Sequence, residues 1–278
     1  MQKIVIKKNN EEEFFDEEKF CKNLINLGID EEKANKICKK IYGKIPSKIS
    51  SSELFKITLN ELKKEHIGLA SRYNLKEALY KLGPTGFPFE KYVGKILAHY
   101  GYETFINIWI EGKCIEYEID ILAIKESERF IIECKYHKDY GVKSDLKTVL
   151  YVFGRWIDIK EKNPELKPWL VTNTKITIEG IKFAECKNLK ITAWKYPKNE
   201  SLEKLIEYKF LYPTTILLGV PQNIIKTLIE NNFVLIQDFL FYSIEEISKK
   251  TNIPIKILEK IKNQVDALVE IKNISNNF

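Results

Sequence analysis

A charged hairpin pattern at residues 116–138 constrains the fold of this chain most strongly. The segment EYEIDILAIKESERFIIECKYHK contains two runs rich in Ile, Leu and Phe, at 117–124 and 129–136, separated by the polar residues 125–128. Because neither run contains Pro or Gly, the pattern predicts two antiparallel strands joined by a short turn. Residues 130–132 are all apolar, which is typical of a strand covered on both faces.

The alternation of side chains along a strand predicts where the charged groups point. Successive side chains point to opposite faces of a strand. Glu116, Glu118 and Asp120 are therefore expected on one face of the first strand, and Glu133 and Lys135 on one face of the second. The apolar residues between them are expected on the opposite faces: Ile119, Ile121, Ala123, Ile132 and Cys134.

The converging carboxylates predict a cation site. Two carboxylates on neighbouring strands repel each other, and a divalent cation removes that repulsion. Oxygen ligands favour Mg²⁺ (or Mn²⁺), which retains water molecules that can act as nucleophiles. Asp120 and Glu133 are the expected ligands, with the carbonyl of Cys134 as a third, and Lys135 would act on the water or on a phosphate. The alternative interpretation is an ion-paired ladder on an exposed hairpin.

The order of these residues resembles a known superfamily of nucleases. Asp120, followed by Glu133-Cys134-Lys135 at the end of the next strand, is similar to the PD-(D/E)XK motif, and within that superfamily to the Mrr-like restriction endonucleases. The resemblance covers residues 83–198. It implies an α/β endonuclease core that hydrolyses DNA phosphodiester bonds with a metal ion, and it implies catalytic roles for Asp120, Glu133 and Lys135.

The elements around the hairpin fit such a core. Hydrophobic periodicity predicts the following order: a helix at 89–100, a strand at 103–110, the hairpin, a helix at 144–160, a strand at 168–173, a helix at 177–186 and a strand at 189–196. In the superfamily, the helix before the first strand often contributes an acid, and Glu90 is the matching position. The alternative role of Glu90 is to stabilise the helix N-terminus. Glu118 would be an accessory acid.

The long helix at 144–160 carries a candidate DNA-binding stripe. Lys147, Tyr151 and Arg155 recur at intervals of four residues and therefore line up on one side of the helix. Two basic groups around an aromatic ring could follow a DNA backbone beside the metal site. A solvated helix face is the alternative.

Residues 1–82 resemble the ATP-cone domain, a nucleotide-sensing regulatory module. Strands at 2–8 and 11–15 precede helices at 16–27, 30–42, about 53–66 and 69–82, with the segments KKNN, FDEEK, ISSSEL and ASRY in the family's order. The resemblance implies binding of ATP or dATP through the basic pair after the first strand, Lys7 and Lys8. Two solvated lysines on a plain helical domain are the alternative.

Residues 199–278 are expected to form a third, helical domain. The segment LLGVP at 217–221 resembles a helix–hairpin–helix element, in which the turn glycine, Gly219, lets backbone N–H groups approach a phosphate. A second copy at 250–254 has Asn252 where glycine is usual. The region holds 9 basic and 10 acidic side chains, a balance of −1, which does not favour phosphate binding. Protein interaction or formation of a homodimer is the alternative.

Length and composition set the outer limits. A chain of 278 residues can form two or three domains. A net charge of +6 permits DNA binding without demonstrating it. There is no apolar run long enough to span a membrane, and the N-terminus lacks the pattern of a signal peptide. The five cysteines form no CxxC pair, so we expect reduced, mostly buried thiols and a cytoplasmic protein.

Together these patterns predict three domains, at 1–82, 83–198 and 199–278, around an α/β endonuclease core. The function that they favour is an Mg²⁺-dependent DNA endonuclease regulated by ATP or dATP. The first alternative is a nucleotide-responsive DNA-binding protein whose nuclease core is inactive. The second is an interaction scaffold that binds no nucleic acid. The sequence does not specify the structure or sequence of the DNA substrate.

Overall fold

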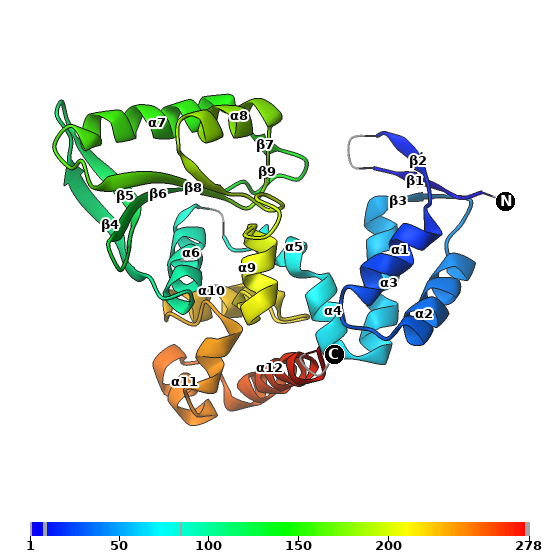
Figure 1. Ribbon diagram of the computed structural model, residues 1–278. Helices are drawn as coiled ribbons and strands as arrows, with labels where there is room; N and C mark the ends of the chain where they lie inside the picture. Colours follow the sequence, from blue (N-terminus) through cyan, green and yellow to red (C-terminus); the bar gives the residue numbers. More distant parts are fainter. Residues whose placement is uncertain (1, 8–9, 84, 276–278) are drawn as a thin grey trace. The chain divides into compact units, whose positions relative to one another are not determined.

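The computed structural model of the chain, shown in Figure 1, describes residues 2–7, 10–83 and 85–275. The chain forms two compact units. One, here called the terminal unit, comprises Met1–Ala78, Thr215–Thr227 and Phe239–Phe278, and the other, the sheet unit, comprises Leu79–Thr214 and Leu228–Asp238. Residues 199–278 thus contribute to both units, and the division at 82/83 and 198/199 into three consecutive domains stays a prediction.

A five-stranded mixed sheet in the order β10-β8-β6-β5-β4 organises the sheet unit. β4, β5 and β6 are antiparallel, whereas β8 runs parallel to β6 and β10 parallel to β8. The elements of this unit follow the predicted order: α6 (Phe87–His99), β4 (Glu103–Glu111), β5 (Glu116–Lys125), β6 (Glu128–Lys135), α7 (Leu146–Lys160), β8 (Leu166–Thr172), α8 (Ile178–Cys186), β10 (Lys190–Thr192) and α9 (Leu202–Lys209), with the short pair β7 (Lys143–Ser144) and β9 (Lys175–Ile176). The prediction of a mixed α/β architecture is confirmed.

Helices cover both faces of this sheet, α7 and α8 on one face and α6 on the other (Figure 1). Gly94 allows α6 to approach closely, since a Cβ atom there would lie 3.2 Å from Cδ1 of Ile106 and 3.9 Å from Cδ1 of Ile121. On the opposite face, Val149 and Val152 of α7 pack in one buried cluster with Leu170 of β8. This two-sided cover explains why the strands are rich in apolar residues.

Several boundaries in the sheet unit differ from the sequence prediction, two of them for a clear structural reason. The β5–β6 turn is tighter than 125–128, because Lys125 pairs with Glu128 and Glu126 adopts a φ of 53°. Positive φ values are usual in two-residue hairpin turns. β10 ends at Thr192 instead of continuing to 196, since Ala193 turns back to form an antiparallel bridge with Tyr196.

The terminal unit combines a small sheet, in the order β2-β1-β3, with helices. Elements near the two chain ends are β1 (Ile4–Ile6), β2 (Glu12–Phe14), α1 (Glu17–Ile25), α2 (Glu31–Lys44), β3 (Lys48–Ser50), α3 (Ser51–Glu65), α4 (Ile67–Tyr73), α11 (Ile244–Thr251) and α12 (Ile255–Ser275). The remaining short elements are α5 (Leu75–Leu79), η1 (Thr214–Ile216), α10 (Gln222–Glu230) and η2 (Ile236–Leu240). The sequence prediction missed β3, whose three residues give too short a pattern. It also ended α2 too early at Gly43.

The cysteines correct one prediction. Cys21 of α1 and Cys38 of α2 form a disulfide, with their Cα atoms 5.8 Å apart, inside the usual range for such a bond. Cys134 is a buried free thiol as expected, but Cys114 and Cys186 are exposed. The expectation of five reduced, mostly buried thiols was therefore wrong. None of the described helices is both long and apolar enough to cross a membrane.

Candidate active site

Asp120 and Glu133 lie side by side where the β5–β6 ladder ends. The last paired residues on that side are Ile121 and Ile132, so Asp120 and Glu133 occupy the next position on the two strands. The Asp120 carboxylate accepts a hydrogen bond of 2.7 Å from the backbone N–H of Cys134. Asp120 thus holds the end of β6 in place as well as presenting an acid.

The strand alternation is interrupted at this point, contrary to prediction. β4 pairs with β5 at Ile106–Ile121 and Ile108–Ile119, but the intervening Asn107 has a φ of 54° and forms no pair. Ile121 therefore faces α6, whereas Ile119 packs with Ile131 in a cluster on the α7 face. The prediction that Ile119 and Ile121 share a face was wrong, because it assumed a strand without a kink.

Glu90 completes a group of three acids. It lies half-buried in the first turn of α6. Burial, together with the charges of Asp120, Glu133 and Glu118, raises its pKa to about 7. Burial and the charge of Asp120 likewise raise the pKa of Glu133 to about 7, although Arg155 and Lys135 act in the opposite direction. The pKa of Asp120 is raised chiefly by burial. The charge of Asp120 thus raises the pKa values of both Glu90 and Glu133, which places the three carboxyl groups close together.

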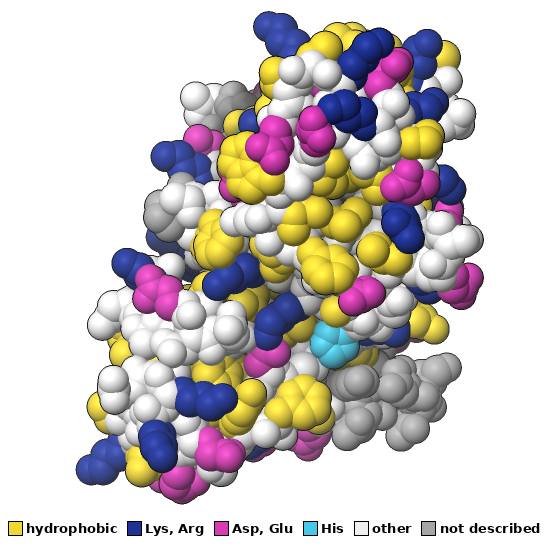
Figure 2. Space-filling view, turned by 90° about the vertical axis from the view of Figure 1, so that its left-hand side faces the viewer, with side chains coloured by type: hydrophobic (Ala, Val, Ile, Leu, Met, Phe, Trp, Pro, Cys, Tyr) yellow, Lys and Arg dark blue, Asp and Glu magenta, His cyan; other side chains and the backbone are white. Residues whose placement is uncertain are grey.

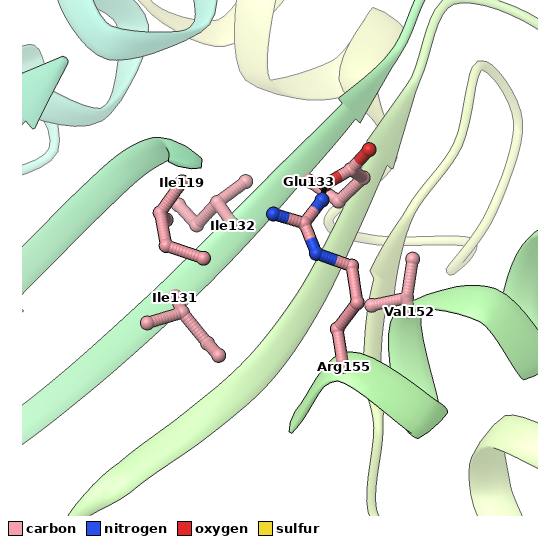
Figure 3. A pocket seen from close by; sticks show the side chains of 6 residues that line it. All are labelled: Ile119, Ile131, Ile132, Glu133, Val152 and Arg155. Carbon is pink, nitrogen blue, oxygen red and sulfur yellow. Dashed lines mark hydrogen bonds and ion pairs between the residues drawn. The ribbon is translucent and has the colours of Figure 1, made fainter. Parts of the chain in front are cut away.

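Arg155 of α7 is part of this site, facing inward. Its guanidinium donates to Oε2 of Glu133 and to the backbone carbonyl of Glu118, and it lies 5.4 Å from the ring centroids of both Tyr117 and Tyr151. Figure 3 shows the side chain reaching from the helix to Glu133. A small pocket beside it is lined by Ile119, Ile131, Ile132, Glu133, Val152 and Arg155. The sequence pattern had suggested a DNA contact for Arg155 and did not indicate this ion pair.

Lys135 is exposed and, within the described part of the chain, makes no hydrogen bond or ion pair. The backbone just after it is fixed by Asn173, which accepts from the N–H of His137 at 2.9 Å and donates to its carbonyl at 2.8 Å. The position of Lys135 is therefore fixed by β6 before it and by the two hydrogen bonds between Asn173 and the His137 backbone after it. Cys134, between Glu133 and Lys135, is buried, and burial raises the pKa of its thiol.

Three other residues were predicted to bind DNA: Lys147, Tyr151 and Gly219. Lys147 and Tyr151 are exposed on α7, so they remain accessible. Gly219 is exposed with a φ of 74°, and Asn252 has a φ of 57°. Both turn residues therefore adopt a left-handed backbone conformation, which glycine and asparagine tolerate. Phosphate binding at these turns stays a prediction.

The predicted nucleotide contact is described only in part. Lys7 forms ion pairs with Glu13 at 2.7 Å and Glu11 at 3.9 Å, and these neighbours raise the pKa of Lys7. Lys8 lies outside the described residues. Nucleotide binding at this basic pair stays a prediction.

The described side chains do not form a three-ligand metal cluster. Within residues 2–7, 10–83 and 85–275, no group of three or more His, Cys, Asp or Glu side chains has the arrangement to hold a metal ion. The predicted ligand set is smaller, with two carboxylates and one backbone carbonyl. Such a set suits Mg²⁺, which usually keeps several of its water molecules in proteins.

Comparison with known proteins places the chain in a family. No known protein-family profile matches it. An uncharacterized protein of Archaeoglobus fulgidus is 38% identical over 146 residues, which make up 52% of this chain and 82% of that protein. The chain belongs to the same family as that protein. A crystal structure of a protein of unknown function, AF1548, is also similar, with 31% identity, a TM-score of 0.56, and coverage of 72% of this chain and 100% of the other. These relatives carry no established activity.

Two more distant similarities involve named proteins. A repair endonuclease from Pyrococcus abyssi is 17% identical, with a TM-score of 0.28, over 35% of this chain and 39% of its own. Can2 from Sulfobacillus thermosulfidooxidans, solved with cyclic tetra-adenylate, is 17% identical, with a TM-score of 0.32, over 38% of this chain and 32% of its own. Both similarities are too weak to assign an activity to this family.

Proposed function

We propose that the chain is an Mg²⁺-dependent DNA endonuclease that hydrolyses phosphodiester bonds at Asp120, Glu133 and Lys135, with Glu90 as a third acid. The observation that carries the proposal is the convergence of carboxylates from α6, β5 and β6. Burial raises the pKa values of Glu90, Asp120 and Glu133, and the charge of Asp120 further raises those of Glu90 and Glu133. Groups with such perturbed pKa values often mark functional sites.

The donor atoms fit a hard divalent cation. Asp120 and Glu133 offer only oxygen atoms, and two like charges held together in a partly buried place favour binding of a cation. Asp120 and Glu133 would hold Mg²⁺ or Mn²⁺, with the carbonyl of Cys134 as a third ligand. When bound, the ion would supply positive charge and an activated water molecule.

The remaining side chains have separate roles in this proposal. Lys135 has an exposed ammonium group without a partner in the described chain, so it would bind the scissile phosphate or orient the attacking water. Glu90 changes its protonation state near neutral pH, so it could accept a proton from that water. Arg155 keeps Glu133 oriented. Glu118 contributes its carbonyl to Arg155 and leaves its carboxylate as an accessory acid.

The proposal agrees with the resemblance to PD-(D/E)XK nucleases. The order of strands around the motif and the position of Glu90 on the preceding helix match what that resemblance implied. The proposal has further parts. ATP or dATP would regulate the enzyme at the N-terminal segment, Lys147 and Tyr151 would bind DNA, and the turn at Gly219 would bind phosphate.

We also propose that the protein forms a homodimer and is located in the cytoplasm.

DNA binding would rest on local contacts. Figure 2 shows one face of the molecule, on which basic, acidic and hydrophobic side chains are interspersed, so the side chains coloured there form no continuous basic surface. A mild net charge of +6 is consistent with a protein that binds DNA at a few positions.

The test is a cleavage assay with purified protein on supercoiled plasmid, single-stranded circular DNA and branched oligonucleotides. We expect cleavage with Mg²⁺ or Mn²⁺, none with EDTA, and none for Glu133→Gln. A matched control is Glu179→Gln, which alters an exposed acid on α8. If no substrate is cut under any of these conditions, the proposed activity is wrong.

The Arg155–Glu133 ion pair favours a second candidate function. The guanidinium already places a positive charge on Glu133 without a metal ion, as would suit a DNA-binding protein with an inactive nuclease core. That protein would bind DNA equally well with Mg²⁺ or EDTA and would leave it intact. Gel-shift measurements beside the cleavage assay separate the two candidates.

A further inference from the structure

Trp109 lies directly across from Glu118, the accessory acid of the candidate active site. It belongs to β4, the edge strand of the five-stranded sheet, and its partner in the β4–β5 register is Glu118. Residues directly opposite each other in an antiparallel pair project to the same face, with Cβ atoms about 4.5–5.5 Å apart. Glu118 is two residues from Asp120 and contributes to the raised pKa of Glu90.

The exposure of Trp109 distinguishes it from the other tryptophans of the chain. Its exposed fraction is 62%, whereas those of Trp169 and Trp194 are 2% and 4%. The fourth, Trp156, is partly buried and donates its indole N–H to the carbonyl of Leu166. Among the described residues, no aromatic ring packs against Trp109. Packing within the fold therefore accounts for the indoles of Trp156, Trp169 and Trp194 and leaves the indole face of Trp109 open.

The position of Trp109 suits a neighbouring nucleotide. Its cross-strand partner, Glu118, accepts through its backbone carbonyl from the same Arg155 guanidinium that donates to Glu133. An indole beside Glu118 can reach the base of a nucleotide whose phosphate lies at the acids. Aromatic side chains bind single-stranded nucleic acid by stacking on bases, whose faces are covered in a duplex.

We infer that the indole of Trp109 is a stacking platform for an unpaired base, and that the substrate of the site is DNA with unpaired nucleotides beside the scissile bond. This inference rests on the proposed nuclease function and narrows its substrate class. Fully paired DNA offers no free base face near the cut, so it would be bound and cut less well. Trp109 acts in positioning the strand and does not take part in the bond-breaking step.

The test uses Asp120→Asn protein, in which cleavage is blocked, and a fluorescein-labelled oligo-dT of about 15 nucleotides. Anisotropy gives the affinity, and quenching of protein emission reports stacking on an indole. We expect Trp109→Ala in this background to weaken oligo-dT binding at least about fivefold and to abolish most of the quenching, because the variant loses the stacking of one base on the indole. Trp109→Phe should restore most of the affinity.

Two controls make the result specific. Phe105→Ala removes another exposed aromatic from β4, one paired with Leu122 instead of an acid, and should leave oligo-dT affinity unchanged. Binding of a duplex of the same length should change less than twofold in Trp109→Ala. Unchanged oligo-dT binding in Trp109→Ala, or equal loss for duplex and single strand, would overturn the inference. Tighter binding of oligo-U than oligo-dT would overturn the choice of DNA.

Failure of the nuclease proposal would look different. If wild-type protein cuts no DNA but Trp109→Ala loses oligo-dT binding selectively, the stacking role is supported and the nuclease activity is refuted. If wild-type protein cuts DNA while Trp109→Ala binds and cuts single strands normally, the nuclease activity is supported and the stacking role is refuted. If no oligonucleotide binds to the Asp120→Asn protein or to wild type, the nuclease activity and the stacking role are both refuted.

Discussion

The guanidinium of Arg155 donates from Nη1 to Oε2 of Glu133, joining the middle of α7 to the end of β6. Both side chains are largely buried, with exposed fractions of 14% and 21%. The same guanidinium reaches the carbonyl of Glu118 on β5. One residue therefore neutralises a candidate ligand and ties a helix to two strands, which couples the charge of the site to its stability.

Replacing Arg155 should have two opposite effects. Arg155→Gln removes the positive charge beside Glu133, so the Mg²⁺ concentration for half-maximal binding should fall several-fold. In EDTA, stability should drop by about 1–3 kcal/mol, less than the ~3–5 kcal/mol typical of breaking a fully buried pair. Calorimetric Mg²⁺ titration and thermal melts measure both quantities. Lys147→Gln on the same helix is the control, and unchanged metal binding in Arg155→Gln would contradict the assignment of Glu133 as a ligand.

Glu90 should make stability depend on pH in the absence of metal. Its pKa is raised to about 7 in the folded chain, so between about pH 4.5 and pH 7 the folded state binds more protons than the unfolded state. Stability is lost as pH rises through this window. Glu90→Gln should therefore melt higher than wild type at pH 8 in EDTA, with a smaller difference at pH 5. Glu179→Gln should show no such trend, and a difference independent of pH would refute the shifted pKa.

Glu61 of α3 should have the opposite dependence. Its buried carboxylate forms ion pairs with Lys40, Lys44 and Lys64, and hydrogen bonds from these lysines, Lys44 first, lower its pKa to about 2. The stabilisation is present above about pH 4.5 and is lost as pH falls towards 2. Glu61→Gln should lower the melting temperature at pH 7 and approach wild type near pH 3. Equal destabilisation at both pH values would show that packing, not charge, matters at Glu61.

Lys135 should act on turnover more than on metal binding. Lys135→Ala removes an exposed ammonium group that contacts no ligand atom, so the maximal cleavage rate should fall by about 100-fold or more while the Mg²⁺ requirement changes little. Lys135→Arg should recover only part of the rate, because the guanidinium is larger and planar. Lys138→Ala, an exposed lysine three residues on, is the matched control. Full activity in Lys135→Ala would contradict the catalytic role of Lys135. It would favour the alternative interpretation, in which the charged residues of the hairpin are an ion-paired ladder.

Periodicity of the sequence was enough to predict the parts of the site that depend only on regular strands and helices. Two apolar strands with a short turn bring Asp120 beside Glu133, and a helix start places Glu90 near them. Periodicity could not predict the kink at Asn107, since a positive φ depends on the local backbone. That kink sends Ile119 to the face opposite Ile121.

Long-range partners were also beyond sequence reasoning. The four-residue spacing on α7 correctly put Arg155 and Tyr151 on one stripe, where their side chains now lie together. It could not show that the guanidinium reaches across to Glu133, because the distance between helix and strand depends on packing. The same limit applies to Cys21 and Cys38, which come together only when α1 packs on α2.

Single-turnover cleavage by Asp120→Asn is the most direct test of the proposed active site. The amide keeps an acceptor for the N–H of Cys134 but removes the charge that would hold a metal ion. We predict that the variant folds and binds DNA like wild type, and that its Mg²⁺-dependent cleavage rate falls at least about 1,000-fold, while Asp266→Asn on α12 cuts normally. Cleavage by Asp120→Asn at the wild-type rate would contradict the assignment.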